Sequence, residues 1–176
     1  MRILVTGASN NVGQAVVEAL AAAGHAVRAF GVATGSGLFA NAGNVQTYPG
    51  WVETGGSVEP AASECQAIVH ASCLDPPGKD KVAHAVHLER GTLYTRYAAE
   101  RELVQRFVAL FPADAPRGSA KSIGAAKAIV HATRASVPRT VLDVGDAAAA
   151  VQGVLAALSG IQDQAIEAAH AADATA

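Results

Sequence analysis

The first thirteen residues, MRILVTGASNNVG, constrain the fold more than any other stretch of the chain. Residues 3–5 form a short apolar run, and Thr6 and Gly7 end it, which predicts a buried strand that enters a tight turn. From Val12 onward, apolar residues recur at steps of three and four, and Gly24 follows as a C-terminal cap. In a strand, turn and helix of this kind, the helix N-terminus faces an anion, usually a pyrophosphate.

The glycines of the turn decide how closely it matches a dinucleotide-binding turn. In such turns one glycine makes the bend, a second lets the backbone approach the pyrophosphate, and a third lets the helix pack on the strand. Gly7 and Gly13 suit the first and third roles, but the middle position is Asn10. Asparagine tolerates a left-handed backbone, so we expect Asn10 to preserve the turn while its side chain projects toward the phosphate position. A turn that binds nothing is the alternative.

Composition excludes several classes of partner. The chain of 176 residues is 51% hydrophobic and 16% charged, which is typical of a compact globular protein. A net charge of −2 without a basic stripe argues against nucleic acid. No apolar run reaches the roughly 18 residues of a membrane span, and the first strand leaves no room for a secretory signal, so we expect a cytoplasmic protein. Cys65 and Cys73 are too few for a disulfide framework and are expected in the core.

Strands and helices are predicted to alternate along the chain. Further strands are expected at residues 25–30, 45–48, 67–71, 107–111 and 139–144. Helices are expected at residues 57–64 with Ser57 as cap, 81–105 with a weak point at Gly91, 120–135, and 147–158 with Gly160 as its end. Residues 159–176 are Ala-rich and are expected to form a terminal helix or tail beyond a domain of residues 1–158. The pattern predicts an α/β fold, a Rossmann-like doubly wound parallel sheet of about six strands with helices on both faces.

Several stretches, in the same order over residues 1–158, resemble the short-chain dehydrogenase/reductase superfamily. The similarity is greatest to its extended branch of NAD-dependent epimerases and dehydratases and to its atypical, NmrA-like relatives. TGASNNVG resembles the family's TGxxGxxG, and CQAIVHAS, RGTLYTRYAAE and QRFVALF resemble its fourth strand, its GT-containing helix and its fifth strand. SIGAAKAIV is similar to the segment with the YxxxK pair, and VLDVGDAAAAV to the VDVxDVA stretch. The resemblance implies an NAD(P)-binding domain, although the chain has almost no room for the extended branch's substrate domain.

The family's catalytic positions are altered in this chain. In the family a Ser or Thr polarises the substrate carbonyl, a Tyr exchanges the proton, and a Lys holds the nicotinamide ribose. The matching positions are Phe111, Ile123 and Lys127. Because isoleucine has no proton to exchange, we expect no catalysis through residue 123. Lys127 is either the ribose ligand or a solvated surface lysine, and Gly31 after the second strand indicates no preference between NAD and NADP.

The candidate site residues follow from the turn and from the resemblance. The candidates for binding NAD or NADP are Gly7, Ser9, Asn10, Asn11, Val12, Gly13, Gly31, Trp51, Ala71, Ser72 and Lys127. The candidates for catalysis are Lys127, Asp75, His84 and Ser122. Trp51 could stack on adenine, but a lone tryptophan beside a turn more often packs in the core. His70 is expected to be a core histidine. His84 and His87 are one helical turn apart, but no third ligand is evident, so we predict no metal site.

Three functions from different classes remain open. The first is a small oxidoreductase or epimerase-like enzyme that positions NAD(P)H against an easily reduced small-molecule substrate without the tyrosine. The second is a non-catalytic NAD(P) sensor or partner protein, as among the NmrA-like relatives. The third is a cofactor-free isomerase or cyclase on the same fold. Lys127 and the strand order favour the first, whereas Asn10 and Gly31 favour the other two. The resemblance also implies a homodimer through the helices at residues 81–105 and 120–135.

Overall fold

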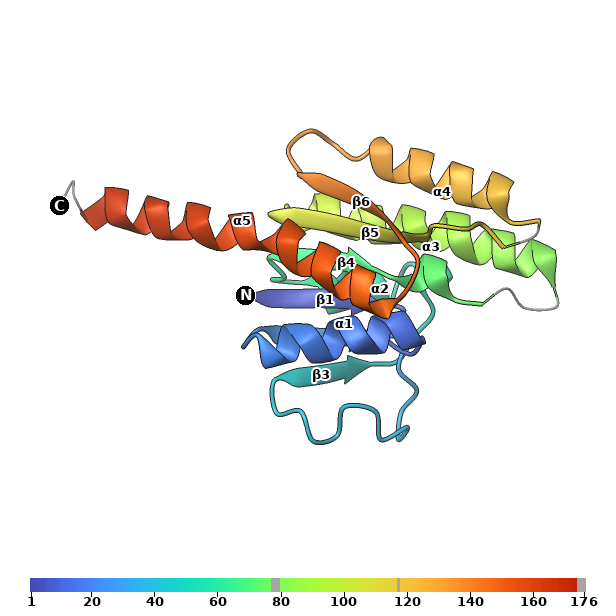
Figure 1. The fold of residues 1–176 in the computed structure, drawn as a ribbon, viewed down its shortest axis with the longest axis horizontal. Helices are drawn as coiled ribbons and strands as arrows, with labels where there is room; N and C mark the ends of the chain where they lie inside the picture. Colours follow the sequence, from blue (N-terminus) through green and yellow to red (C-terminus); the bar gives the residue numbers. More distant parts are fainter. Residues whose placement is uncertain (77–79, 117, 174–176) are drawn as a thin grey trace.

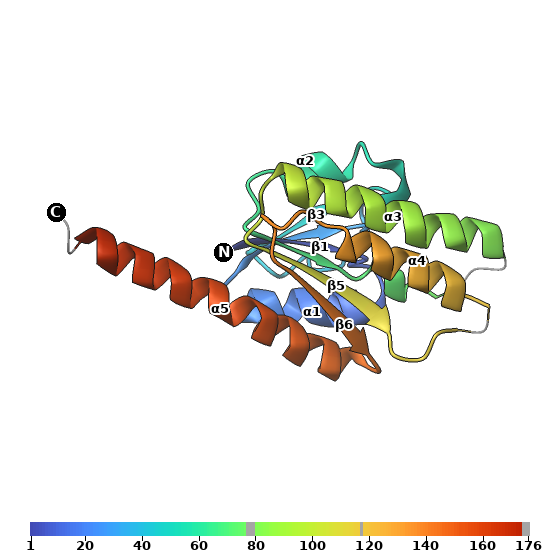
Figure 2. The same cartoon turned by 90° about the horizontal axis from the view of Figure 1, so that it is seen from above.

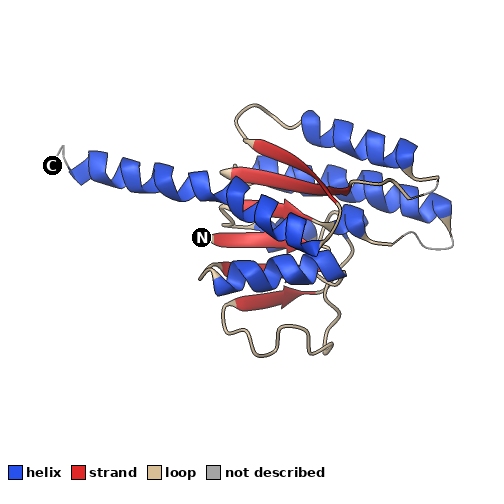
Figure 3. Ribbon diagram, in the orientation of Figure 1, coloured by secondary structure: helices blue, strands red, loops and turns tan. Residues whose placement is uncertain are grey.

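Six parallel strands form the single sheet of the computed structural model, which describes residues 1–76, 80–116 and 118–173, with side chains through residue 161 (Figures 1 and 3). The strands are β1 (Arg2–Thr6), β2 (Ala26–Phe30), β3 (Val45–Tyr48), β4 (Ala67–His70), β5 (Arg106–Pro112) and β6 (Arg139–Val144). Their order is β3-β2-β1-β4-β5-β6, and every neighbouring pair is parallel. The chain therefore crosses from one half of the sheet to the other beside β1, and the predicted Rossmann-like fold is confirmed.

Helices cover both faces of the sheet (Figure 2). One face carries α1 (Asn11–Ala22) and α5 (Ala147–Asp173), and the other carries α2 (Val58–Ala62), α3 (Lys81–Arg101) and α4 (Ala120–His131). Two short 3₁₀ helices, η1 (Val52–Thr54) and η2 (Ser72–Leu74), follow β3 and β4. Successive side chains of β1 point to opposite faces, so Ile3 and Val5 join the core under α1 and α5, while Leu4 joins the core under α2, α3 and α4.

Several helix boundaries differ from the predicted ones. α3 ends at Arg101 because Leu103 takes a positive φ of 49°, which turns the chain out of the helix. Gly91 is no weak point, since a Cβ there would lie 2.6 Å from Val52 Cγ2, and the glycine lets η1 pack closely on α3. Ser57 does not cap α2 through its side chain. Its hydroxyl instead shares a hydrogen bond with Thr54 Oγ1 at 3.2 Å.

The last two helices also end at residues other than those predicted. α4 stops at His131 instead of residue 135. α5 continues through Gly160 to Asp173, so the predicted end at Gly160 is wrong. A glycine inside a helix costs only about 1 kcal/mol relative to alanine, which the helix-forming residues around it offset. The domain boundary near residue 158 stays a prediction. Among the described residues, none of the helices combines the length and apolar character that a bilayer crossing requires.

Candidate functional site

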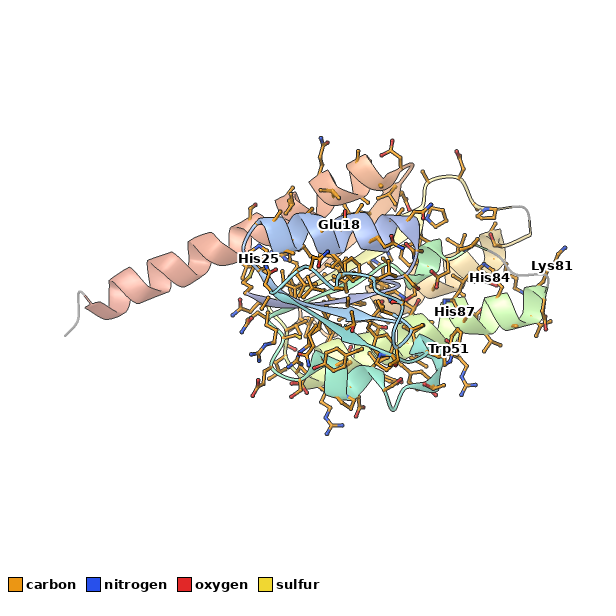
Figure 4. The ribbon with its side chains drawn as sticks, turned by 90° about the horizontal axis from the view of Figure 1, so that it is seen from below. Glu18, His25, Trp51, Lys81, His84 and His87 are labelled. Atoms are coloured by element: carbon orange, nitrogen blue, oxygen red, sulfur yellow. The ribbon has the colours of Figure 1, made fainter. Side chains whose placement is uncertain are left out.

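A hollow of about 280 Å³ lies at the carboxyl ends of β1, β2 and β4 and beside the segment that follows β3. Figure 4 shows Trp51 and His87, two of its lining residues, at this end of the sheet. The lining is contributed by Gly7, Ser9, Gly31, Val32, Ala33, Pro49, Gly50, Trp51, Val52, Ser72, Asp75 and His87. The site therefore occupies the edge at which ligands of open parallel sheets bind, as predicted.

Gly7 and Gly13 let three backbone segments meet behind this hollow. Gly7 has a φ of +72°, and a Cβ there would lie 2.6 Å from the backbone nitrogen of Ser72. A Cβ on Gly13 would lie 2.1 Å from the carbonyl oxygen of Gly7. Only glycine fits either position, so both have the conformational roles that the sequence indicated: Gly7 makes the turn, and Gly13 packs α1 on β1.

Asn10 does not adopt the expected left-handed backbone. Its φ of −82° and ψ of 160° are extended, and it is the N-cap of α1, with Oδ1 accepting from the N–H of Gly13 at 2.7 Å. Its Nδ2 donates to the carbonyl of Ala71 at 3.1 Å and to Asp75 Oδ1 at 2.7 Å. The left-handed geometry is unnecessary because the side chain itself closes the turn. An anion at this helix terminus therefore competes with Asn10 for one N–H donor.

His87 joins two carboxylates at the wall of the hollow. Its Nε2 lies 2.9 Å from Asp75 Oδ2, and its Nδ1 lies 3.1 Å from Glu53 Oε2. The hydrogen bond with Asp75 raises the pKa of His87 above its ordinary value of 6.5, burial opposes the rise, and Glu53 adds to it. When the ring is protonated, it donates to both carboxylates, and Asp75, His87 and Glu53 then form a charged network that links η1, α3 and the end of η2.

Ser72 is a residue of the hollow whose buried hydroxyl lacks a hydrogen-bond partner among the described residues. It is only 2% exposed, and its hydroxyl has no hydrogen-bond partner within the described protein. A buried hydroxyl without a partner costs free energy, and a polar ligand atom would remove that cost. Ser72 lies two residues after the end of β4 and lines the hollow, so a ligand there would lie beside a residue whose hydroxyl has no partner in the described part of the protein.

Trp51 and Gly31 also line the hollow. Trp51 is 70% exposed, so the expectation that it packs in the core is wrong. The extended backbone at Trp51 between Gly50 and η1 holds the ring outside the core. Gly31 has a φ of +89°, a backbone region that glycine occupies most easily. Together they leave an aromatic face beside an open backbone, which suits a planar ligand ring.

Other predicted cofactor ligands lie near the hollow but do not all line it. Ala71 is fully buried and contributes its carbonyl to Asn10. A second hollow, of about 540 Å³, adjoins the first at the start of α1. It is lined by Ser9, Asn10, Asn11, Val12, Leu74, Asp75 and Pro76. Ser9 and Asp75 line both hollows, so they mark the boundary between them.

Lys127 and the catalytic candidates of α3 and α4 do not line either hollow. Lys127 Nζ forms an ion pair with Asp143 Oδ1 of β6 at 2.6 Å and lies 5.6 Å from the centre of the Phe111 ring. Ser122 is half-buried on α4, and His84 lies on α3 outside the lining residues. Burial lowers the pKa of His84 below its ordinary value. Of the residues predicted to be catalytic, only Asp75 lines the hollow together with the residues predicted to bind the cofactor. The histidine of α3 that lines the hollow is His87 and not the predicted His84.

The remaining titratable residues near β4 belong to the core. His70 is fully buried between Thr6 Oγ1 at 2.7 Å and Thr92 Oγ1 at 3.1 Å, and burial lowers its pKa to about 3. The expectation of a core histidine is confirmed. Cys65 and Cys73 are buried as predicted, and burial raises the pKa of Cys73 to about 12. In the part of the chain that the structure describes, no group of three or more His, Cys, Asp or Glu side chains could hold a metal ion.

Solved structures with this fold include several that contain NAD. The Bordetella bronchiseptica enzyme WbmG in complex with NAD matches with a TM-score of 0.68 at 22% identity, over 81% of this chain and 52% of its own. A short-chain dehydrogenase/reductase superfamily protein from Agrobacterium tumefaciens with bound NAD gives 0.67 at 22% identity, over 81% and 48%. UDP-glucuronic acid 4-epimerase from Bacillus cereus in complex with NAD gives 0.70 at 14% identity, over 81% and 55%.

These similarities establish the fold that the sequence resemblance implied. The chain spans about half the length of the solved structures that it matches. No protein-family model matches the sequence, and the comparison with curated proteins found no match.

Proposed function

We propose that this protein binds NAD or NADP at the hollow and acts as a small oxidoreductase or epimerase-like protein on a small-molecule substrate. The observation that carries the proposal is the orphaned hydroxyl of Ser72, which is buried, lines the hollow and has no partner in the described protein. The exposed ring of Trp51 and the glycine backbone at Gly7 and Gly31 support it, because a dinucleotide needs a stacking surface and close backbone approach.

The residues of the two hollows fit different parts of such a cofactor. Trp51 and Gly31 suit the adenosine moiety, because they combine an aromatic face with an open backbone. The start of α1, with Asn11 and Val12 in the second hollow, suits the pyrophosphate, since helical N–H groups and the helix dipole attract anions. The nicotinamide ring, when bound, supplies hydride transfer. The protein supplies binding and orientation, with Ser72 as a hydrogen-bonding partner.

A non-catalytic NAD(P) sensor or partner protein is the second candidate. Ile123, at the position of the family's tyrosine, is only 5% exposed and lies in the core cluster with Phe111. Lys127 is already paired with Asp143. Neither side chain is available to move a proton, so a protein that binds the dinucleotide without turning it over is consistent with these contacts.

Fluorescence titration tests the binding proposal directly, because Trp51 is the only tryptophan of the chain. NAD, NADH, NADP and NADPH are each titrated, and Trp51 emission is expected to change with at least one of them. Calorimetry on the wild type measures the same affinity without relying on fluorescence. If no form binds at millimolar concentration, the proposal is wrong and a cofactor-free function gains support. Turnover with candidate carbonyl substrates then separates an enzyme from a sensor.

Ser72→Ala provides a sharper test because stability and affinity should change in opposite directions. Removing an unpaired buried hydroxyl should leave the free energy of unfolding unchanged or raise it. Losing one ligand hydrogen bond should weaken cofactor affinity by about two- to twelve-fold. The matched control is Ser119→Ala, since the Ser119 hydroxyl donates to the carbonyl of Pro116 at 2.7 Å. That control should lower stability and leave affinity unchanged.

We also propose that two copies associate through α3 and α4. Val82, Val86 and Tyr97 of α3 are exposed, which supports an apolar contact on this helix. Analytical ultracentrifugation tests the association, and a mass of one chain at all concentrations would contradict it.

A further inference from the structure

Asp75 lies where the two hollows meet, and two side chains hold it there. Asn10 Nδ2 donates to its Oδ1 at 2.7 Å, and His87 Nε2 contacts its Oδ2 at 2.9 Å. These three residues come from the turn before α1, from the end of η2 and from α3. We call them the Asp75 clasp. Asp75 lines both hollows, so a ligand that occupied the two together would lie next to the carboxylate of Asp75.

The charges around the clasp are few and well defined. Among the described residues that line the two hollows, Asp75 and His87 are the only ionisable ones. Glu53 of η1 contacts the other ring nitrogen of His87 at 3.1 Å, and the buried His70 and the half-buried His84 lie close enough to interact with its charge. A carboxylate therefore stands beside the helix terminus that would receive an anion, and the imidazolium of His87 neutralises it in part.

We propose that Asp75 is a specificity-determining residue that couples the binding of phosphate-bearing ligands to a proton on His87. This inference rests on the proposed nucleotide binding at the same hollows. With His87 protonated, its positive charge offsets part of the repulsion between the Asp75 carboxylate and the ligand phosphates. With His87 neutral, the carboxylates of Asp75 and Glu53 lose their countercharge and repel those phosphates. A ligand without phosphate is indifferent to the change.

The direction of the pH dependence follows from the contacts of His87. Its hydrogen bond with Asp75 raises the pKa of His87 above 6.5, so the ring is protonated below that pH and loses its proton as the pH rises through the raised pKa. Affinity for a phosphate-bearing nucleotide should fall over the same interval. By linkage, binding such a ligand should take up protons in that interval.

The test compares NAD with adenosine, which lacks phosphate, from pH 6 to pH 9. Calorimetry is carried out on the wild type, on the near-isosteric Asp75→Asn and on His87→Gln, with folding checked by circular dichroism. NAD affinity of the wild type should fall about tenfold over this range, while adenosine affinity stays constant. Asp75→Asn should bind NAD about tenfold more tightly than the wild type at pH 9, and its pH dependence should move to lower pH with the titration of His87. The control His131→Gln, on the last turn of α4, should retain the wild-type profile.

The outcomes separate this inference from the proposed function. NAD binding whose pH profile is the same in the wild type and Asp75→Asn overturns the inference and leaves the proposed function standing. If neither the wild type nor the variants bind NAD, both are overturned. Imidazole NMR titration gives a readout without ligand: the midpoint of His87 should move to lower pH in Asp75→Asn. An unchanged midpoint would show that the clasp does not hold the proton.

Discussion

Asn10→Ala should lower stability measurably, because the Asn10 side chain makes three hydrogen bonds. It accepts from the N–H of Gly13 and donates to the carbonyl of Ala71 and to Asp75, at 2.7, 3.1 and 2.7 Å. Each such bond contributes about 0.5–1.5 kcal/mol net, and an N-cap contributes about 1 kcal/mol. Asn10 is only half-buried, so water replaces part of what is lost. We expect a loss of about 2 kcal/mol, which for a chain of this length lowers Tm by about 4–8 °C.

A second variant divides this effect between the cap and the clasp. Asn10→Ser keeps an oxygen that accepts from the N–H of Gly13, but it is too short to reach Ala71 and Asp75 together. Its Tm should therefore lie between those of the wild type and Asn10→Ala. Scanning calorimetry at pH 6, with urea unfolding as a second measure, provides both values. An Asn10→Ala protein that melts within 1 °C of the wild type would refute the assigned hydrogen bonds, and equal melting of the two variants would refute the cap.

Three further changes separate structural from ligand-binding roles. Gly13→Ala places a Cβ 2.1 Å from the carbonyl oxygen of Gly7, so α1 must shift and the urea midpoint should fall by the equivalent of about 1–3 kcal/mol or more. Ile123→Tyr introduces, in a buried position, the tyrosine that the sequence resemblance would place there, and we expect a stability loss of about 1–3 kcal/mol in urea without any reductase activity in a cofactor oxidation assay. Lys127→Ala removes an ion pair with the half-exposed Asp143, so stability should fall by less than about 1 kcal/mol and cofactor affinity in calorimetry should not change. A clear loss of affinity would instead support the ribose role inferred from the sequence.

The candidate site could be predicted only in part because its side chains come from distant segments. The sequence placed Asp75 beyond the fourth strand and selected His84 over His87 on the next helix. Packing of α3 against η1 and η2 decides which of these histidines faces the site, and it turns His87 toward Asp75 and Glu53. The spacing of His84 and His87 was a visible signal, but spacing alone does not show which face of a helix meets the sheet edge.

Sequence alone determined the parts of this protein that depend on local rules. Alternating strand and helix patterns predicted the parallel sheet, and Gly7 and Gly13 predicted the close turn, because backbone sterics and periodicity act within a few residues. Tertiary structure decided the chemistry of the site. It exposed Trp51, paired Lys127 with β6 and left the Ser72 hydroxyl without a partner. These outcomes depend on which side chains come into contact when the helices pack on the sheet, and a local sequence pattern does not specify those contacts.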